Sequence, residues 1–197
     1  MPQIGQQHTG APDSAGRVSL RHAVAVVPAV LAAVLLALTL SGPARSTPGT
    51  GHVALSSLET GIVVELNRIR AAHGLMPLRL SIGLTEAAEQ HSREMGLDGY
   101  FAHSSFDGAP YWRRISSWYG WSGYSMWSVG ENLLWSSPNV APASALDLWM
   151  HSPEHRANIL TAAWREVGIA AVHVDAAGGQ FDGRAVTLIT TDFGVRR

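Results

Sequence analysis

The alternation of apolar and polar positions divides the chain of 197 residues into three parts. Residues 1–22 are mostly polar and rich in Gly, Gln and Ser, a composition that predicts a disordered segment. Residues 23–40 are uncharged and almost continuously apolar, with Arg17 and Arg21 before them and small residues after them as far as Ala44. The remainder mixes apolar and polar positions at the spacings of helices and strands, and therefore predicts a folded domain.

Residues 23–44 have the features of a segment that directs a chain to a membrane. A positive region, an apolar run and a small-residue exit are typical of a secretory signal peptide, which would be cut near Ala44. The same run of 18 residues is close to the ~20 that an uncleaved transmembrane helix needs, and the preceding arginines would keep residues 1–22 in the cytoplasm. Both interpretations stay open. Both predict that the following residues are extracytoplasmic, either secreted or membrane-anchored through residues 23–40.

Residues 45–53 form a short linker rich in Pro, Gly, Ser and Thr, and residues 54–197 form the predicted domain. Ser56 and Glu59 have the spacing of a capping box at the start of a helix. Apolar spacing predicts helices over 58–73, 82–97 and 143–150, and strands over 126–134, 166–174 and 185–193. Because strands and helices do not alternate regularly, we expect an α+β fold in layers rather than a doubly wound parallel sheet.

Composition excludes several classes of function. Apolar residues make up 46% of the chain, which is enough for a substantial core. The chain has 14 basic and 15 acidic residues and shows no basic stripe, so we expect no nucleic-acid partner. It has no cysteine, which excludes disulfides, thiolate chemistry and cysteine metal ligands.

Three features of the domain are candidates for a functional site. His103 follows the aromatic pair Tyr100–Phe101 on a loop that we expect to be anchored by burial, whereas His91 lies on the apolar face of its helix and is interpreted as a core residue. Glu131 lies within an apolar strand and needs a partner if it is buried. Residues 111–135 contain five of the seven Trp residues, which supply either core or an aromatic wall for an apolar or glycan ligand.

The densest group of polar residues lies in 149–160, where residues 151–155 read H-x-x-E-H. That string occurs in one class of zinc peptidases, in which both histidines share one face of a helix. Pro153 lies inside the string and disfavours a continuous helix, because it has no backbone N–H and restricts the residue before it. We therefore expect a helix to end near His151 and a new turn to begin at Pro153, which argues against zinc peptidase chemistry.

Several pieces of the domain, taken in order, resemble one known family. They are L-N-R-I-R-A-A-H-G-L at 66–75, H-S-R-E-M at 91–95, G-Y-F-A-H at 99–103, G-E-N-L at 130–133, W-M-H-S-P-E-H-R-A-N-I-L at 149–160, V-G-I-A at 167–170 and T-D-F-G at 191–194. Together they resemble the CAP superfamily of cysteine-rich secretory, antigen 5 and pathogenesis-related proteins, in particular its bacterial SCP-like branch. The resemblance covers roughly residues 57–194.

The resemblance implies an α-β-α sandwich with a three-stranded antiparallel sheet and a cleft lined by histidines and acids. The cleft residues it implies are His103, Glu131 and His155. Many eukaryotic members have a second acid three residues after the helix tryptophan, where this chain has Ser152, and Glu154 would be its substitute. Asn158 completes the polar group. An alternative interpretation is that Glu131, His155 and Asn158 form a satisfied hydrogen-bond network that holds the sheet to the last helix. Members with all four residues bind a divalent metal such as zinc, so His103, Glu131 and His155 are the metal ligands that the resemblance implies.

Two functions follow as expectations. The first is a non-enzymatic extracytoplasmic domain that binds a small apolar molecule, a lipid or a cell-envelope component in this cleft. The alternative is a metal-dependent hydrolase that cleaves peptide or envelope polymer with the same residues.

Overall fold

The computed structural model describes residues 3–4 and 54–197. Its elements are β1 (Gln3–Ile4), α1 (Ser57–Ala72), β2 (Arg79–Leu80), α2 (Ile82–Asp98), α3 (Tyr111–Trp118), β3 (Trp127–Ser136), α4 (Pro142–His151), α5 (Pro153–Ile159), β4 (Glu166–Ala177), the short 3-10 helix η1 (Gly179–Phe181) and β5 (Arg184–Arg196). The predictions for the segment 23–44 and for the linker 45–53 lie outside the described residues, as does most of the segment 1–22 that was predicted to be disordered. Within that segment Gln3–Ile4 form a short strand instead. Within the described residues, no helix is long and apolar enough to cross a membrane.

The centre of the domain is a sheet with strand order β1-β3-β5-β4-β2. Its three long strands, β3, β5 and β4, are antiparallel neighbours, as the resemblance implied. Two strands of two residues extend the edges: β2 pairs in parallel with β4, and β1 pairs with β3 opposite Leu134 and Trp135. The sequence analysis predicts neither short strand, because two residues carry no periodicity.

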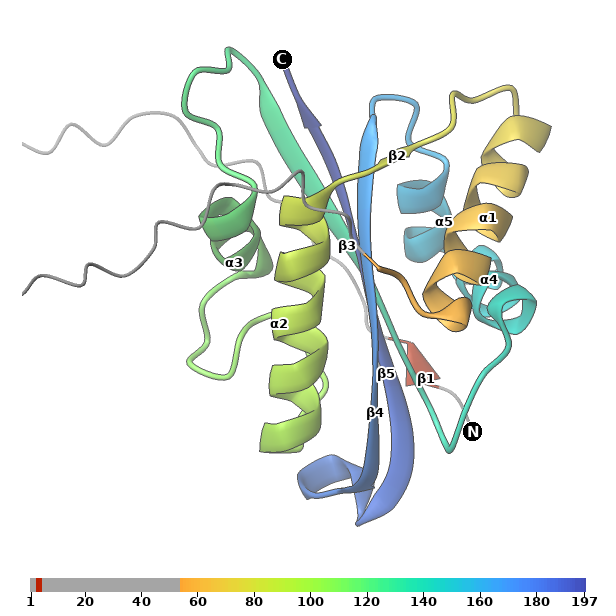
Figure 1. Ribbon diagram of the computed structural model, residues 1–197, viewed down its shortest axis with the longest axis vertical. Helices are drawn as coiled ribbons and strands as arrows, with labels where there is room; N and C mark the ends of the chain where they lie inside the picture. The colour runs from red at the N-terminus through yellow and green to blue at the C-terminus, as the bar shows by residue number, and fades with distance from the viewer. Residues whose placement is uncertain (1–2, 5–53) are drawn as a thin grey trace, which may run out of the picture. The chain divides into compact units, whose positions relative to one another are not determined.

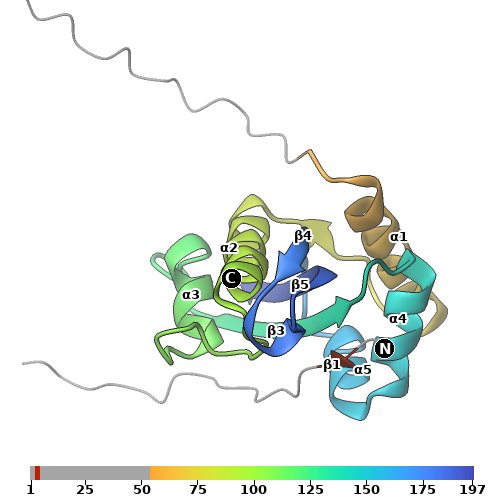
Figure 2. The ribbon, with the colours of Figure 1, turned by 90° about the horizontal axis from the view of Figure 1, so that it is seen from below.

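Helices cover both faces of the sheet (Figure 1). Helices α2 and α3 lie on one face, and α1, α4 and α5 lie on the other, as the view turned by 90° also shows (Figure 2). The largest apolar cluster joins the sheet to α1, α4 and α5, while two smaller clusters join it to α2, α3 and η1. The α+β layered fold predicted from the sequence is therefore confirmed.

Most predicted helix limits agree with the structure to within one residue. Ser56 and Glu59 form the predicted capping box, in which the Ser56 backbone N–H donates to Glu59 Oε2 at 2.7 Å. Helix α2 ends at Gly99, which adopts the left-handed conformation (φ 69°) that glycine tolerates best. The sequence was not predicted to form helix α3, because its buried stripe of Tyr111, Arg114 and Ile115 spans only eight residues and includes a charged side chain.

Helix α2 lies unusually close to strand β4. A Cβ atom built on Gly168 would lie 2.0 Å from the carbonyl carbon of Leu84, so no side chain fits between the helix backbone and the strand. This contact fixes the height of α2 above the sheet, and with it the position of His91 on the buried face of α2.

Arg70 connects α1 to the end of α5. Its side chain is fully buried, and its Nη1 donates to the carbonyl oxygens of Ile159 at 2.7 Å and Thr161 at 3.0 Å. Its Nε donates to the carbonyl of Met76 at 3.0 Å. A cation at the carbonyl end of a helix is favourable, and here it holds in place the short helix that carries His155.

Candidate functional site

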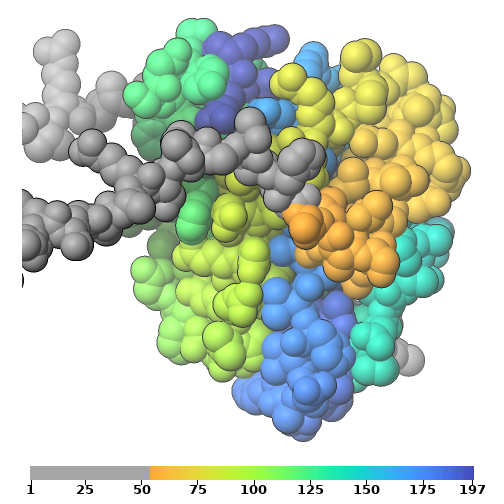
Figure 3. All heavy atoms as spheres, in the orientation of Figure 1, coloured from red at the N-terminus to blue at the C-terminus, as the bar shows by residue number. Residues whose placement is uncertain are grey.

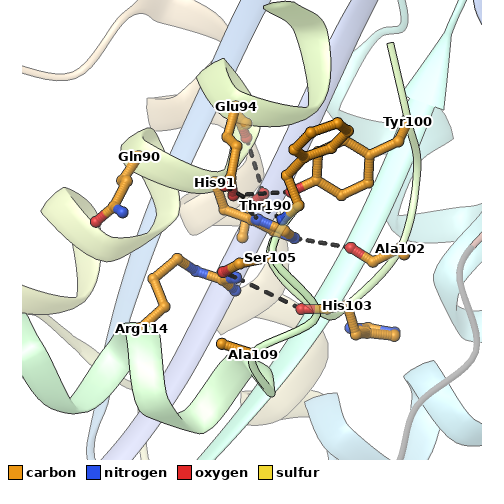
Figure 4. A network of polar contacts seen from close by, with 12 residues as sticks. Gln90, His91, Glu94, Tyr100, Ala102, His103, Ser105, Ala109, Arg114 and Thr190 are labelled. Carbon is orange, nitrogen blue, oxygen red and sulfur yellow. Dashed lines mark hydrogen bonds and ion pairs between the residues drawn. The ribbon is translucent and has the colours of Figure 1, made fainter. Parts of the chain in front are cut away.

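His103 and Glu131 are brought together from separate elements. His103 lies on the loop after α2 and Glu131 lies on β3, and His103 Nδ1 is 2.7 Å from Glu131 Oε1. The histidine side chain is 14% exposed and the glutamate 1% exposed, so the pair lies at the edge of the core. The loop is fixed by His91, whose Nε2 lies 2.8 Å from the carbonyl oxygen of Ala102 (Figure 4).

Arg114 of α3 is the second partner of the carboxylate. Its Nη2 contacts Glu131 Oε2, and its Nη1 donates to the carbonyl of His103 at 3.4 Å and to Ser105 Oγ at 3.3 Å. The Arg114 side chain is 2% exposed. Both oxygens of Glu131 are therefore engaged, one by an imidazole and one by a guanidinium. Arg114 also holds the loop that carries His103 and Ser105 (Figure 4).

A second carboxyl group, that of Asp192, lies beside Glu131. The two residues are cross-strand partners on β3 and β5, and Asp192 is fully buried. Burial raises the pKa of Glu131, but the charges of Arg114, His91 and His103 outweigh burial and hold that pKa at about 2. Burial, followed by the Glu131 charge, holds the pKa of Asp192 well above its usual range. Of the two carboxyl groups, Asp192 is therefore the one that keeps its proton to higher pH.

His91 belongs to a neighbouring group of polar residues. It is completely buried and hydrogen-bonded, as the sequence analysis predicts for a core histidine. Its Nδ1 lies 3.5 Å from Glu94 Oε2, which also accepts a hydrogen bond from the Tyr100 hydroxyl at 2.7 Å (Figure 4). The His91 contact lowers the pKa of Glu94 to about 2, against the opposing effect of burial and with help from Tyr100 and the Phe106 N–H.

His155 is held by contacts of its own helix and of β3. Its ring is buried, and its Nδ1 lies 2.7 Å from Ser152 Oγ. Its carbonyl accepts a hydrogen bond from Asn132 Nδ2 at 3.2 Å. Because neighbouring residues of a strand point to opposite faces, Asn132 faces α5 whereas Glu131 faces α3. His155 therefore contacts Ser152 and Asn132 on the α5 side of the sheet. Glu131 contacts His103 on the α3 side.

Asn158 and Glu154 differ in their surroundings. Asn158 is buried, and its Nδ2 donates to Asn132 Oδ1 at 3.0 Å. A Cβ on Gly130 would lie 2.5 Å from Asn158 Oδ1, so the glycine before Glu131 allows Asn158 to reach the strand. Glu154 is exposed, and its Oε2 lies 3.5 Å from Ser152 Oγ.

The H-x-x-E-H string is divided between two helices. Helix α4 ends at His151, and α5 begins at Pro153 with Ser152 in an extended conformation between them. His151 is exposed and lies 3.3 Å from Asp147, whereas His155 is buried. The predicted interruption of the helix at Pro153 is therefore confirmed, and His151 and His155 do not share one helical face.

The metal role implied by the resemblance stays a prediction. Among the described residues, no group of three or more His, Asp or Glu side chains is placed to hold a metal ion. Glu131 would have to release His103 or Arg114 before it could offer an oxygen to a metal. We therefore derive no step through a metal.

Arg114 and Asp192 are the site residues that the sequence analysis missed. Arg114 shares the buried face of α3 with Tyr111 and Ile115, at helical spacing, and that spacing was the available signal. Asp192 is an acid within an apolar strand, which is the same signal that identified Glu131. Ser152 also acquires a role, since it occupies the place of the family's second acid and contacts His155 instead.

Comparison with protein families and with solved structures agrees with this architecture. Residues 63–188 match the model of the cysteine-rich secretory protein (CAP) family. Since this match covers more than half of the chain, the protein belongs to the CAP family. Comparison with curated protein sequences gave no match.

Three solved bacterial structures are similar to the chain. An outer surface protein of Borrelia burgdorferi is 18% identical with a TM-score of 0.53, over 69% of this chain and 90% of that one. An extracellular protein with an SCP domain from Bacillus anthracis is 24% identical with a TM-score of 0.51, over 74% of this chain and 45% of that one. A cysteine-rich secretory protein of Staphylococcus aureus is 17% identical with a TM-score of 0.47, over 77% and 44%. At these identities the first two support the fold alone.

Proposed function

We propose that the protein is a non-enzymatic, extracytoplasmic binding domain whose ligand is a small apolar molecule, a lipid or a cell-envelope component. The ligand would lie at His103 and Glu131, on the side of β3 that faces α3. The resemblance also assigns His155, Glu154 and Asn158 to the cleft, and these belong to α5 on the other side of β3. The apolar run 23–40, which follows Arg17 and Arg21 in the sequence, supports a location of the domain outside the cytoplasm. The descriptions of the Borrelia and Bacillus anthracis proteins as outer surface and extracellular support it too.

One observation carries the binding role: Glu131 orients His103, and the other ring nitrogen of His103 is buried without a partner among the described residues, as expected of a polar atom that a ligand satisfies. Glu131 is ionised and accepts only, so His103 Nδ1 is the donor in their hydrogen bond. Within the described residues, His103 Nε2 makes no hydrogen bond. In the neutral imidazole that nitrogen is an acceptor, so it fits a hydroxyl or amide N–H of a ligand.

The geometry argues against Glu131 itself as a general base. Such a base must be free to accept a proton, but both Glu131 oxygens are engaged and its pKa is about 2. On the same loop as His103, Phe106 is 66% exposed and packs against Tyr100 with ring centroids 5.6 Å apart. An exposed apolar ring on this loop supports a ligand that is at least partly apolar.

Mass spectrometry of molecules that copurify with the native full-length protein tests the proposal. We expect a bound apolar molecule in the wild type and its loss in His103→Ala. His151→Ala is the matched control, because His151 is exposed and lies outside the cleft. The binding role is refuted if the same molecules accompany all three proteins in equal amounts, or if none accompanies any.

The hydrolase alternative makes a different prediction for the same cleft. It requires His103, Glu131 and His155 to share one metal ion, so zinc loading should give one equivalent in the wild type and much less in His103→Ala or His155→Ala. If zinc loading of the wild type stays well below one equivalent after dialysis, the metal-dependent hydrolase is excluded.

A further inference from the structure

The outer face of α2 carries a row of polar side chains that takes no part in the cleft. Glu86, Gln90 and Arg93 are spaced by four and three residues, so they share the face of the helix opposite to the buried His91. This face of α2 lies at the molecular surface (Figure 3), and Gln90 points away from the His91 contacts (Figure 4).

The end of α3 places an indole against this row. A Cβ on Gly83 would lie 2.5 Å from the carbonyl oxygen of Trp118, so the two helices touch through backbone at this point. The Trp118 side chain is 47% exposed, and its Nε1 donates to Gln90 Oε1 at 2.7 Å. A surface tryptophan is thus held in one orientation, with part of its ring open to solvent.

A hollow of about 190 Å³ lies between these two helices, and we call it the α2–α3 pocket. Its lining consists of Glu86, Glu89, Gln90, Arg93 and Trp118. It is smaller than the roughly 300–1,000 Å³ of pockets that enclose drug-sized ligands, so it suits a single small group. None of its lining residues contacts His103 or Glu131 in the interactions described above.

The charges of the pocket select the kind of group. Glu89 and Arg93 form an ion pair of 2.6 Å and largely cancel one another. Within the described part of the chain, the Glu86 side chain makes no hydrogen bond or ion pair, so its negative charge remains uncompensated. The face of an indole attracts cations through its quadrupole, and tryptophan is the most effective of the aromatic residues in this role.

We propose that the α2–α3 pocket binds an organic cation, namely a protonated primary amine or a methylated ammonium group. Glu86 supplies the counter-charge, and Trp118 supplies the aromatic wall. Such a group occurs on lysine side chains of peptides and on amine-bearing small molecules, and both present the same chemistry to this pocket. The uncompensated carboxylate disfavours anions, and the charged lining disfavours a purely apolar ligand.

Titration of the full-length protein with tetramethylammonium chloride and with N-acetyl-lysine amide tests the proposal. The indole N–H resonance of Trp118, assigned by its disappearance in Trp118→Phe, should shift and saturate with at least one of the two cations. Sodium chloride at the same ionic strength should not shift it. We expect Glu86→Gln to weaken binding about fivefold to tenfold, since a charge-assisted contact on an exposed site contributes on the order of 1 kcal/mol.

Two matched variants control for indirect effects. Trp121→Leu removes a tryptophan that is 50% exposed but does not line the pocket, and Asp175→Asn removes an exposed carboxylate of β4. Both should bind like the wild type. The proposal is overturned if neither cation gives a saturable shift, if Glu86→Gln binds as well as the wild type, or if glucose shifts the Trp118 resonance while the cations do not. Glu86→Gln changes only a surface charge, so its effect on affinity is measured in a protein that keeps Trp118, and Trp118→Phe serves only to assign the resonance.

Discussion

At the scale of single residues, the guanidinium of Arg114 balances the buried charge of the site. It contacts Glu131, which lies beside Asp192, and both carboxyl groups are removed from water. A charge buried without a partner is costly, because the surrounding protein cannot replace its hydration. The position of α3 therefore matters to the sheet as much as to the loop that carries His103.

We predict that Arg114→Met lowers the free energy of unfolding by about 3–5 kcal/mol, because it leaves the Glu131 charge buried without its guanidinium. Urea denaturation at pH 7 measures the change. Arg113→Met is the control, since Arg113 is the exposed neighbour on the same helix and should change stability by less than about 0.5 kcal/mol. Similar losses in both variants would show that the effect belongs to α3 and not to the buried charge.

Asp192 makes stability depend on pH in a defined direction. Its pKa in the folded protein is raised by burial and by Glu131, so the folded state keeps a proton that the unfolded chain releases above about pH 4. The stabilisation from this group is therefore complete below about pH 4 and is lost as pH rises towards the folded pKa. Glu131 acts oppositely, since its pKa of about 2 gives stability that is lost only as pH falls below about 4.

We predict that Asp192→Asn is about as stable as the wild type at pH 4–5 and more stable at pH 8, because asparagine has the shape of the neutral acid and cannot ionise. The slope of unfolding free energy against pH should be smaller in the variant over this window. Urea denaturation at several pH values between 4 and 9 measures both. A variant that loses more stability at pH 8 than at pH 5 would mean that Asp192 is ionised in the folded protein.

At the scale of elements, the close approach of α2 to β4 leaves no room for a side chain at Gly168. We predict that Gly168→Ala lowers the free energy of unfolding by at least 1–3 kcal/mol, roughly the cost of overpacking a core, because its Cβ would meet helix backbone that cannot rotate away. Thermal unfolding measures the loss.

The control for this prediction is Gly178→Ala. A Cβ at Gly178 meets nothing within 4 Å, and its φ of −76° is open to any residue. This variant should therefore unfold at nearly the wild-type temperature. A Gly168→Ala protein with unchanged stability would show that α2 can shift away from the sheet at little cost.

The sequence predicted the elements that have strong periodicity and missed the short ones. Helices α1, α2 and α4 and the three long strands follow from apolar spacing, with caps such as Ser56 and Gly99 marking their ends. Strands β1 and β2 are too short for a pattern to emerge, and the short stripe of helix α3 is masked by the buried Arg114. Helix α5 was foreseen only as a turn after Pro153.

The candidate site, too, could be predicted from the sequence only in part. His103 and Glu131 could be chosen from the sequence because each is polar in an apolar setting, and the structure pairs them. Their meeting with Arg114 depends on the packing of α3 against β3, which no local pattern encodes. The order of the strands, which makes Asp192 the neighbour of Glu131, is likewise a property of the sheet rather than of either strand.

At the scale of the whole domain, the two binding regions proposed for the molecule use different parts of one helix. The loop that follows α2 carries His103, and the inner face of α2 holds that loop through His91. The outer face of α2 lines the α2–α3 pocket. Helix α3 also serves both, through Arg114 at its buried face and Trp118 at its end. Variants of Glu86 and of His103 can therefore separate the two proposals within one protein.

The strand order also has a consequence for how the chain is made. Strand β5 follows the other strands in the sequence but lies between β3 and β4, and it supplies nearly all of their pairing. While the ribosome is still adding residues before 184, β3 and β4 have no common neighbour, and the sheet cannot assemble. Contacts that join distant parts of a chain form late. The complete three-stranded sheet can therefore form only after β5, the last strand of the sequence, has been synthesised.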